Sequence, residues 1–255
     1  MTVVDALRLS FGTFTGIKVT APKRVDVQVI RIALFLSFIP TLVVSVAAWL
    51  AGYLAFRLTH APLVSAVIVV GAEIALTSGF HIDGLMDAAD GVAALAKTGR
   101  DRALEIMRTG DSGPAAFVTG FLVLSLQVAL LSIAFTRHST VSWIICALLA
   151  RFSVVSSCRK TTIPARPDGL GNPFIGAINY RWLTLSTATN LMIVGILGAG
   201  RFSWLLLVAV LIAIVFGEFL KSRFEKQFGG LTGDMLGSIL EKVRTISLLI
   251  LVFTN

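Results

Sequence analysis

Long runs without an acidic or basic side chain most strongly constrain what this chain can fold into. A run of about 17 to 25 apolar residues can cross a bilayer as a helix. Three such runs hold no acidic or basic residue: 33–56, 113–136 and 182–200. Three more hold a single one: 61–80 with Glu73, 139–158 with Arg151 and 202–220 with Glu218. A seventh run, 245–255, is too short alone and must borrow length from about residue 232 onward.

The composition indicates an integral membrane protein. The 255 residues are 56% hydrophobic and 14% charged, with a mean hydropathy of +0.87, whereas soluble domains carry roughly 25% charged residues. We therefore expect an all-α fold: one membrane-embedded catalytic domain over residues 1–255, built as a polytopic bundle of about seven transmembrane helices. Residues 1–32 lack the basic start, apolar core and cleavage site of a signal peptide, and are expected to form an amphipathic cytoplasmic segment.

Basic residues are spread unevenly, and cytoplasmic loops of membrane proteins collect them. Three predicted turns carry one each, whereas the N-terminal segment and the three other loops carry many more. The basic-rich segments are 1–32 with five, 81–112 with four, 151–181 with five and 218–244 with five. This pattern predicts a cytoplasmic N-terminus, an external C-terminus and a multi-pass protein of the cell (inner) membrane. The net charge of +8 is then mainly a topology signal, with membrane lipid as a partner and no need for nucleic acid.

The segment "GFHIDGLMDAADG" places three carboxylates after an apolar run. On a helix, Asp83, Asp87 and Asp90 are four and three residues apart, so they share one face. Like charges at this spacing repel, which favours a bound cation, and oxygen ligands suit Mg²⁺ together with substrate phosphates. An acidic helix end that faces water is the alternative. His81 is a weaker candidate ligand, and Glu73 is a candidate partner for Arg151.

A second glycine-rich acidic element precedes the last predicted helix. In "FGGLTGDMLGS", glycines that include Gly230 and Gly233 surround Asp234. Such a loop can approach a phosphate closely at a helix N-terminus, or it can be a plain turn. The remaining predicted cytoplasmic loops supply cations that could grip phosphates: Arg108, Arg159, Lys160 and Arg166. Carboxylates and arginines on one side of the membrane describe a site for a metal-bound polyanion.

These motifs resemble one enzyme family. "GFHIDGLMDAADG" is similar to the His-x-Asp-Gly-x-x-Asp-x-x-Asp-Gly signature of cobalamin synthases, the membrane adenosylcobinamide-GDP ribazoletransferases. Three further segments resemble the same family in the same order: "RALEIMRTGDSGPAAF", "ARPDGLG" and "GGLTGDMLG". The N-terminal "FGTFTGIKVTAP" departs from the family pattern because it lacks the expected proline element.

The resemblance implies a reaction. Adenosylcobinamide-GDP and α-ribazole, or α-ribazole 5′-phosphate, would give adenosylcobalamin or its 5′-phosphate plus GMP, with Mg²⁺ required. Asp83, Asp87 and Asp90 would form the metal face and supply the base, and Asp234 would complete the metal shell. His81, Arg108, Arg159, Lys160, Arg166, Gly230 and Gly233 would contact substrate. A homo-oligomer is compatible with this interpretation.

Two alternatives stay open at this point. CDP-alcohol phosphotransferases also bind metal through aspartates, but their motif carries an Ala-Arg that "DGLMD" lacks. A cation-coupled transporter could use Glu73 and the clustered aspartates, but it should show internal repeats with matched broken helices. The acidic motif occurs once in this sequence.

Overall fold

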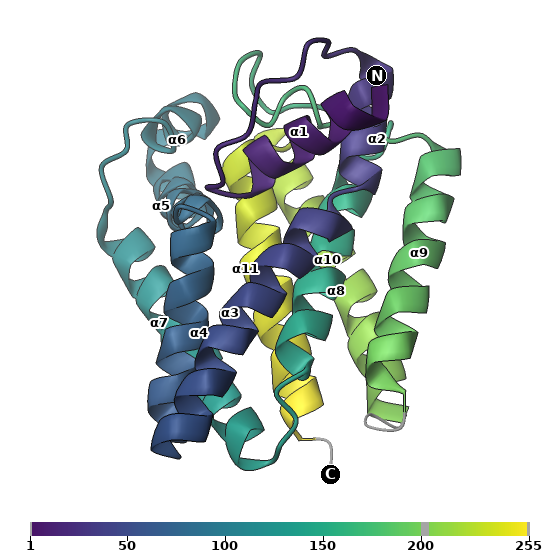
Figure 1. The fold of residues 1–255 in the computed structure, drawn as a ribbon. Coiled ribbons are helices and arrows are strands. Elements are labelled where there is room, and N and C mark those ends of the chain that lie inside the picture. The colour runs from purple at the N-terminus through teal and green to yellow at the C-terminus, as the bar shows by residue number, and fades with distance from the viewer. Residues whose placement is uncertain (1, 200–203, 254–255) are drawn as a thin grey trace.

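The protein is described here by a computed structural model that covers residues 2–199 and 204–253. The described residues form eleven helices joined by turns and irregular loops (Figure 1). In chain order they are α1 (Thr2–Phe14), α2 (Val27–Phe35), α3 (Phe38–Thr59), α4 (Pro62–Leu76), α5 (Phe80–Thr98), α6 (Arg100–Ile106), α7 (Pro114–Thr136), α8 (Ser142–Ser157), α9 (Tyr180–Gly198), α10 (Trp204–Phe228) and α11 (Gly233–Val252). The all-α prediction is confirmed.

Each of the seven predicted runs lies mainly on one of these helices. Residues 200, 202–203 and 254–255 of three runs lie outside the described part of the chain. Among the described residues, three spans are long and apolar enough to cross a membrane: Val27–Thr59, Pro114–Thr136 and Trp204–Phe228. A fourth would be α4 and α5 taken together, although they meet at a bend of 88°. The chain is thus a helical protein with three or four helices of membrane-crossing character.

Helix α11 lies at the centre of the bundle, with α5, α7, α8 and α10 packed around it (Figure 1). Most of its side chains are buried, including Glu241 at 2% exposure and Arg244 at 4%. Helix α1 crosses one end of the bundle, whereas α11 runs toward the opposite end (Figure 1). Residues near α1 and the start of α11 therefore share one end of the molecule, which holds most of the predicted site.

Local sequence signals explain where several helices begin. Pro62 and Pro114 occupy the first turn of α4 and α7, where a missing N–H costs no hydrogen bond. The side chains of Asp26, Asn179 and Thr232 accept hydrogen bonds from free N–H groups at the starts of α2, α9 and α11. The cap at Thr232 fixes the position of Asp234 two residues later.

Candidate active site

A sharp elbow between α4 and α5 sets the direction of the acidic helix. Ser78 and Gly79 both take positive φ angles, of 53° and 71°, and the chain turns through 88° there. Glycine adopts such angles without the steric cost that a side chain imposes. Helix α5 therefore leaves the line of α4 and lies beyond the apolar span, across α7 and α11.

Close backbone contact brings Asp234 beside the carboxylates of α5. A Cβ on Gly84 would lie 3.0 Å from the Cα and carbonyl oxygen of Asp234, and one on Gly237 would lie 3.1 Å from the carbonyl oxygen of His81. These glycines let α5 and the first turn of α11 touch. Asp83 is exposed and Asp87 is half-buried on this side of α5. The structure thus brings together two acids of the first motif and the acid of the second.

Electrostatic repulsion is evident at Asp87. Partial burial, together with the negative charges of Asp83, Asp234 and Asp90, raises its pKa to about 7, although Arg166 opposes them. A carboxyl that resists ionisation beside other carboxylates is stabilised by a cation. This interaction supports the sequence-based view that the acids form a cluster.

Asp90 has a different neighbourhood from the other acids. Its carboxylate is 9% exposed and accepts hydrogen bonds from the backbone N–H groups of Gly113 and Ala116, the latter at 2.9 Å. These are free donors at the start of α7, where a negative charge is favoured. Asp90 therefore fastens α7 to α5, with one backbone hydrogen bond to each of its carboxylate oxygens.

The irregular loop before α9 adds arginines to the rim of the site. Arg166 contacts the Asp234 carboxylate at 3.3 Å and donates to the carbonyl oxygens of Leu104 and Asp168. Arg108 pairs with the Asp168 side chain. A short chain of contacts thus joins Arg108, Asp168, Arg166 and Asp234, so two of the predicted phosphate-binding arginines lie at one edge of the acidic cluster.

The other predicted cations, Arg159 and Lys160, lie apart from this series of contacts. Arg159 forms a two-point ion pair with Glu218 of α10. Lys160 is exposed, and its backbone N–H bonds to Ile178. The structure therefore does not bring either side chain into contact with the acids.

The predicted glycines at the second element serve close backbone packing. The N–H of Ala165 donates to Leu231, and that of Leu231 donates to Ile163. A Cβ on Gly230 would lie 2.5 Å from the Ile163 carbonyl oxygen. A Cβ on Gly171 would lie 2.7 Å from the Cα of Gly233. These contacts hold the Arg166 loop against the start of α11.

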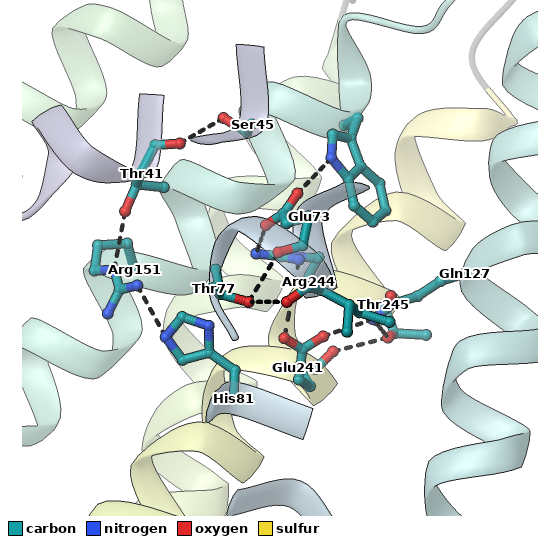
Figure 2. A network of polar contacts seen from close by, with 12 residues as sticks. Thr41, Ser45, Glu73, Thr77, His81, Gln127, Arg151, Glu241, Arg244 and Thr245 are labelled. Carbon is teal, nitrogen blue, oxygen red and sulfur yellow. Dashed lines mark hydrogen bonds and ion pairs between the residues drawn. The ribbon is translucent and has the colours of Figure 1, made fainter. Parts of the chain in front are cut away.

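His81 points into the bundle rather than toward the carboxylates. The histidine is 6% exposed, and its Nε2 lies 3.2 Å from a guanidinium nitrogen of Arg151 (Figure 2). Arg151 also donates to Thr41 at 3.0 Å, and its guanidinium lies over the Phe14 ring at 4.3 Å. His81 thus joins α5 to α8, and Arg151 joins α8 to α1 and α3.

The sequence does not predict the buried network that connects α4, α7, α8 and α11. Glu73 pairs with Arg244 and accepts a hydrogen bond from Trp143 at 2.7 Å (Figure 2). The proposed pairing of Glu73 with Arg151 is therefore wrong, because Arg244 satisfies Glu73 instead. Gln127 of α7 donates to Glu241 at 2.9 Å. Single charges within apolar runs were the available signal, but their partners depend on tertiary packing.

A cavity of about 940 Å³ adjoins the acidic cluster. Asp83 and Gly233 line it at the site, while Phe14, Ile30 and Leu34 line it beneath α1 and α2. Its walls are mainly apolar side chains of six helices and of the loop near Phe174. The cavity can therefore accept an apolar group joined to a second group held at the carboxylates.

The donor atoms of the cluster suit a hard divalent cation. Within residues 2–199 and 204–253, no three acidic, histidine or cysteine side chains are already arranged around one metal position. Mg²⁺ does not need such a cage, because it is commonly bound by one or two carboxylates together with substrate phosphates and water. Asp83, Asp87 and Asp234 supply oxygen ligands of that kind and fit this role.

Comparisons with known proteins agree with the geometry. A family described as Cobalamin-5-phosphate synthase matches residues 6–252. An adenosylcobinamide-GDP ribazoletransferase of Frankia casuarinae is 31% identical, covering 97% of this chain and 94% of its own length. The adenosylcobinamide-GDP ribazoletransferase of a Nocardioides species is 34% identical, covering 96% of this chain and 97% of its own length. That of Escherichia coli K12 is 33% identical over 75% of each chain. No solved structure matches this chain.

Proposed function

This chain belongs to the cobalamin-5-phosphate synthase family, and on that premise we propose that it is an adenosylcobinamide-GDP ribazoletransferase. The reaction joins adenosylcobinamide-GDP to α-ribazole, or to α-ribazole 5′-phosphate, and releases GMP. The observation that carries the proposal is the convergence of Asp83, Asp87 and Asp234 beside Arg166 and a large apolar cavity. The phosphotransferase and transporter alternatives lose their basis, because the family match covers nearly the whole chain.

Bond formation and cleavage take place at the diphosphate. A ribose hydroxyl of the acceptor attacks the phosphorus that bears the cobinamide, the phosphoanhydride bond breaks, and GMP leaves with the bridging oxygen. Asp83, Asp87 and Asp234 would hold Mg²⁺, which would supply neutralisation of the negative charge that develops on the diphosphate. One of these carboxylates accepts the hydroxyl proton.

The arginines at the rim orient the donor. Arg166 and Arg108 reach the same edge of the cluster, and guanidinium groups bind phosphate oxygens in a two-point geometry. Asp234 and Asp168 hold these two arginines in place before substrate binds. Arg159 and Lys160 are assigned no direct contact with substrate, since neither side chain contacts the acidic cluster. His81 lines the cavity and can contact the acceptor there.

The cavity suits the base of the acceptor. Its lining is mainly apolar, which matches the base of α-ribazole, because that base presents mostly apolar surface. A pocket of this size also exceeds the needs of one nucleoside without enclosing a corrinoid. The acceptor would lie under α1 with its ribose directed toward Asp83.

The membrane arrangement completes the proposal. Seven helices that match the predicted runs would cross the cell membrane, with α1 on the cytoplasmic surface and the acidic cluster facing the cytoplasm. The distribution of basic residues supports this orientation. Substrates carrying phosphates would reach the site from the cytoplasm.

Filling the cavity is expected to weaken acceptor use selectively. Replacing Ile30 with tryptophan should raise the KM for α-ribazole about tenfold, because overpacking of a pocket typically costs about 1 to 3 kcal/mol. The KM for adenosylcobinamide-GDP should stay within about twofold, since the donor phosphates bind at the carboxylates. Steady-state GMP release with each substrate varied in turn measures both constants. Leu50→Trp, on an exposed position of α3, is the matched control. An equal rise in the KM values of both substrates in the Ile30 variant would place the acceptor elsewhere.

Acidic pH is expected to weaken Mg²⁺ activation. The pKa of Asp87 is raised to about 7, so this carboxyl binds a proton below pH 7 and releases it above. Protons compete with a metal for the same oxygens, so the Mg²⁺ activation constant should rise as pH falls from 8 to 6, approaching tenfold per unit below 7. Mg²⁺ titrations of GMP release at several pH values measure this constant. A constant independent of pH would remove Asp87 from the metal shell.

A further inference from the structure

A second pocket lies between α5, α7, α10 and α11. Helices α7 and α10 both pack against α11, and with α5 they enclose a pocket of about 230 Å³. Its walls include Ala88 and Val92 of α5, Thr119 of α7 and Phe224 of α10. None of these side chains belongs to the acidic cluster, so this pocket is separate from the proposed active site.

Two cations line this pocket without a carboxylate among its walls. Arg223 reaches it from α10 and Lys242 from α11. The Lys242 ammonium lies 5.8 Å from the centre of the Phe224 ring. Across the described ranges 2–199 and 204–253, no ion pair links Arg223 or Lys242 to an acid. Two neighbouring positive charges beside apolar walls are stabilised by an anion, and the Thr119 hydroxyl is a further donor.

The pocket lies near the ends of two helices, α7 and α10, that are long and apolar enough to cross a membrane. Thr119 lies five residues after Pro114 begins α7, and Arg223 lies five residues before α10 ends at Phe228. At a rise of about 1.5 Å per residue, both positions are about 7 Å inside their helix ends. The polar interface of a bilayer occupies about that depth on each side of its hydrocarbon core.

Apolar side chains continue from the pocket along both flanking helices. Leu122 and Leu126 of α7, on the same helix face as Thr119, are 60% and 43% exposed. Val215 and Phe219 of α10, on the same face as Arg223, are 55% and 53% exposed. A soluble anion would use the cations alone, whereas a lipid would also cover these side chains. We propose that this pocket binds the phosphate of an anionic phospholipid through Arg223 and Lys242, with the acyl chains lying along α7 and α10.

Lipid titration of the full-length protein tests this site. Delipidated protein in mild detergent is titrated with phosphatidylglycerol, and bound lipid is counted by native mass spectrometry. Lys242→Met should weaken binding about fivefold, and Arg223→Gln with Lys242→Met about 25-fold, since each basic residue near an anionic surface contributes about a fivefold gain. Lys242→Arg keeps the charge and should bind within about twofold of the parent protein.

Control variants and competitors separate the possible sources of phosphate. Lys226→Gln removes an exposed charge from the same helix end and should leave binding unchanged. Phosphatidylcholine should bind less tightly than phosphatidylglycerol, and excess inorganic phosphate or GMP should not displace the lipid. Equal lipid binding by the double variant, or an equal loss in Lys242→Arg and Lys242→Met, would overturn the charge assignment. Displacement by inorganic phosphate or GMP would assign the pocket to a soluble ligand and overturn the lipid proposal.

Discussion

Replacing Asp87 with asparagine is expected to lower the rate of GMP release about a thousandfold while leaving the helical fold intact. Asp87 interacts with Asp83, Asp234 and Arg166, so it stands at the centre of the proposed metal face. A bound metal contributes several kcal/mol of charge stabilisation to the transition state, and each 1.36 kcal/mol is tenfold in rate. Purified protein supplied with adenosylcobinamide-GDP, α-ribazole and Mg²⁺ provides the measurement.

The matched control for this substitution is Asp101→Asn. Asp101 is an exposed acid on α6, and removing its charge should change GMP release less than about twofold. Helix content measured by circular dichroism should be the same in both variants. Near-parental activity of Asp87→Asn would exclude this residue from the metal site, and a parental protein that releases no GMP would refute the proposed function itself.

The second large effect is expected at Arg244, on stability. Arg244→Met would leave Glu73 and Glu241 buried without their cation, at 5% and 2% exposure. Breaking one partner of a buried ion pair costs about 3 to 5 kcal/mol because the remaining charge stays uncompensated. The free energy of unfolding in mixed micelles, from a denaturant titration, should fall by that amount.

A double variant separates lost charge balance from lost packing. Glu73→Gln together with Arg244→Met removes both charges of the closer pair and leaves Glu241 with its hydrogen bond from Gln127. Replacing a buried pair by neutral groups costs far less than breaking it. We therefore expect the double variant to recover much of the lost stability. Arg57→Met, at an exposed position on α3, is the control for removing an arginine. An Arg244→Met variant as stable as the parent protein would contradict the prediction, because it would show that Glu73 carries no charge in the bundle.

The sequence predicted the helical fold well because apolar run length is a local property. Each of the six runs that were long enough for a bilayer lies mainly on a helix. The last run was too short alone, and it lies on α11, which gains its length from residues after Thr232. The count of crossings is harder to predict. Helix α8 has only 16 residues, and α4 ends at an 88° elbow. Run length alone does not reveal such bends, because they arise from one or two residues with positive φ.

The candidate site was partly predictable. Spacing placed three acids on one helix face, but it could not show that the start of α7 lies against Asp90. That contact joins residues more than twenty positions apart, and it depends on how α5 and α7 pack. The roles of Gly230 and Gly233 were ambiguous for the same reason, since a glycine needed for backbone contact looks like one needed for phosphate.

Helix α11 links the chemistry to the interior of the bundle. It carries Asp234 in its first turn, at the acidic cluster, and Arg244 three turns deeper, in the ion pair with Glu73. A rigid rod pinned at one point transmits displacement to its other end. Sliding or tilting α11 to widen the site would pull the Arg244 guanidinium away from the buried Glu73 carboxylate. This wall of the active site is therefore expected to stay in place when substrate binds.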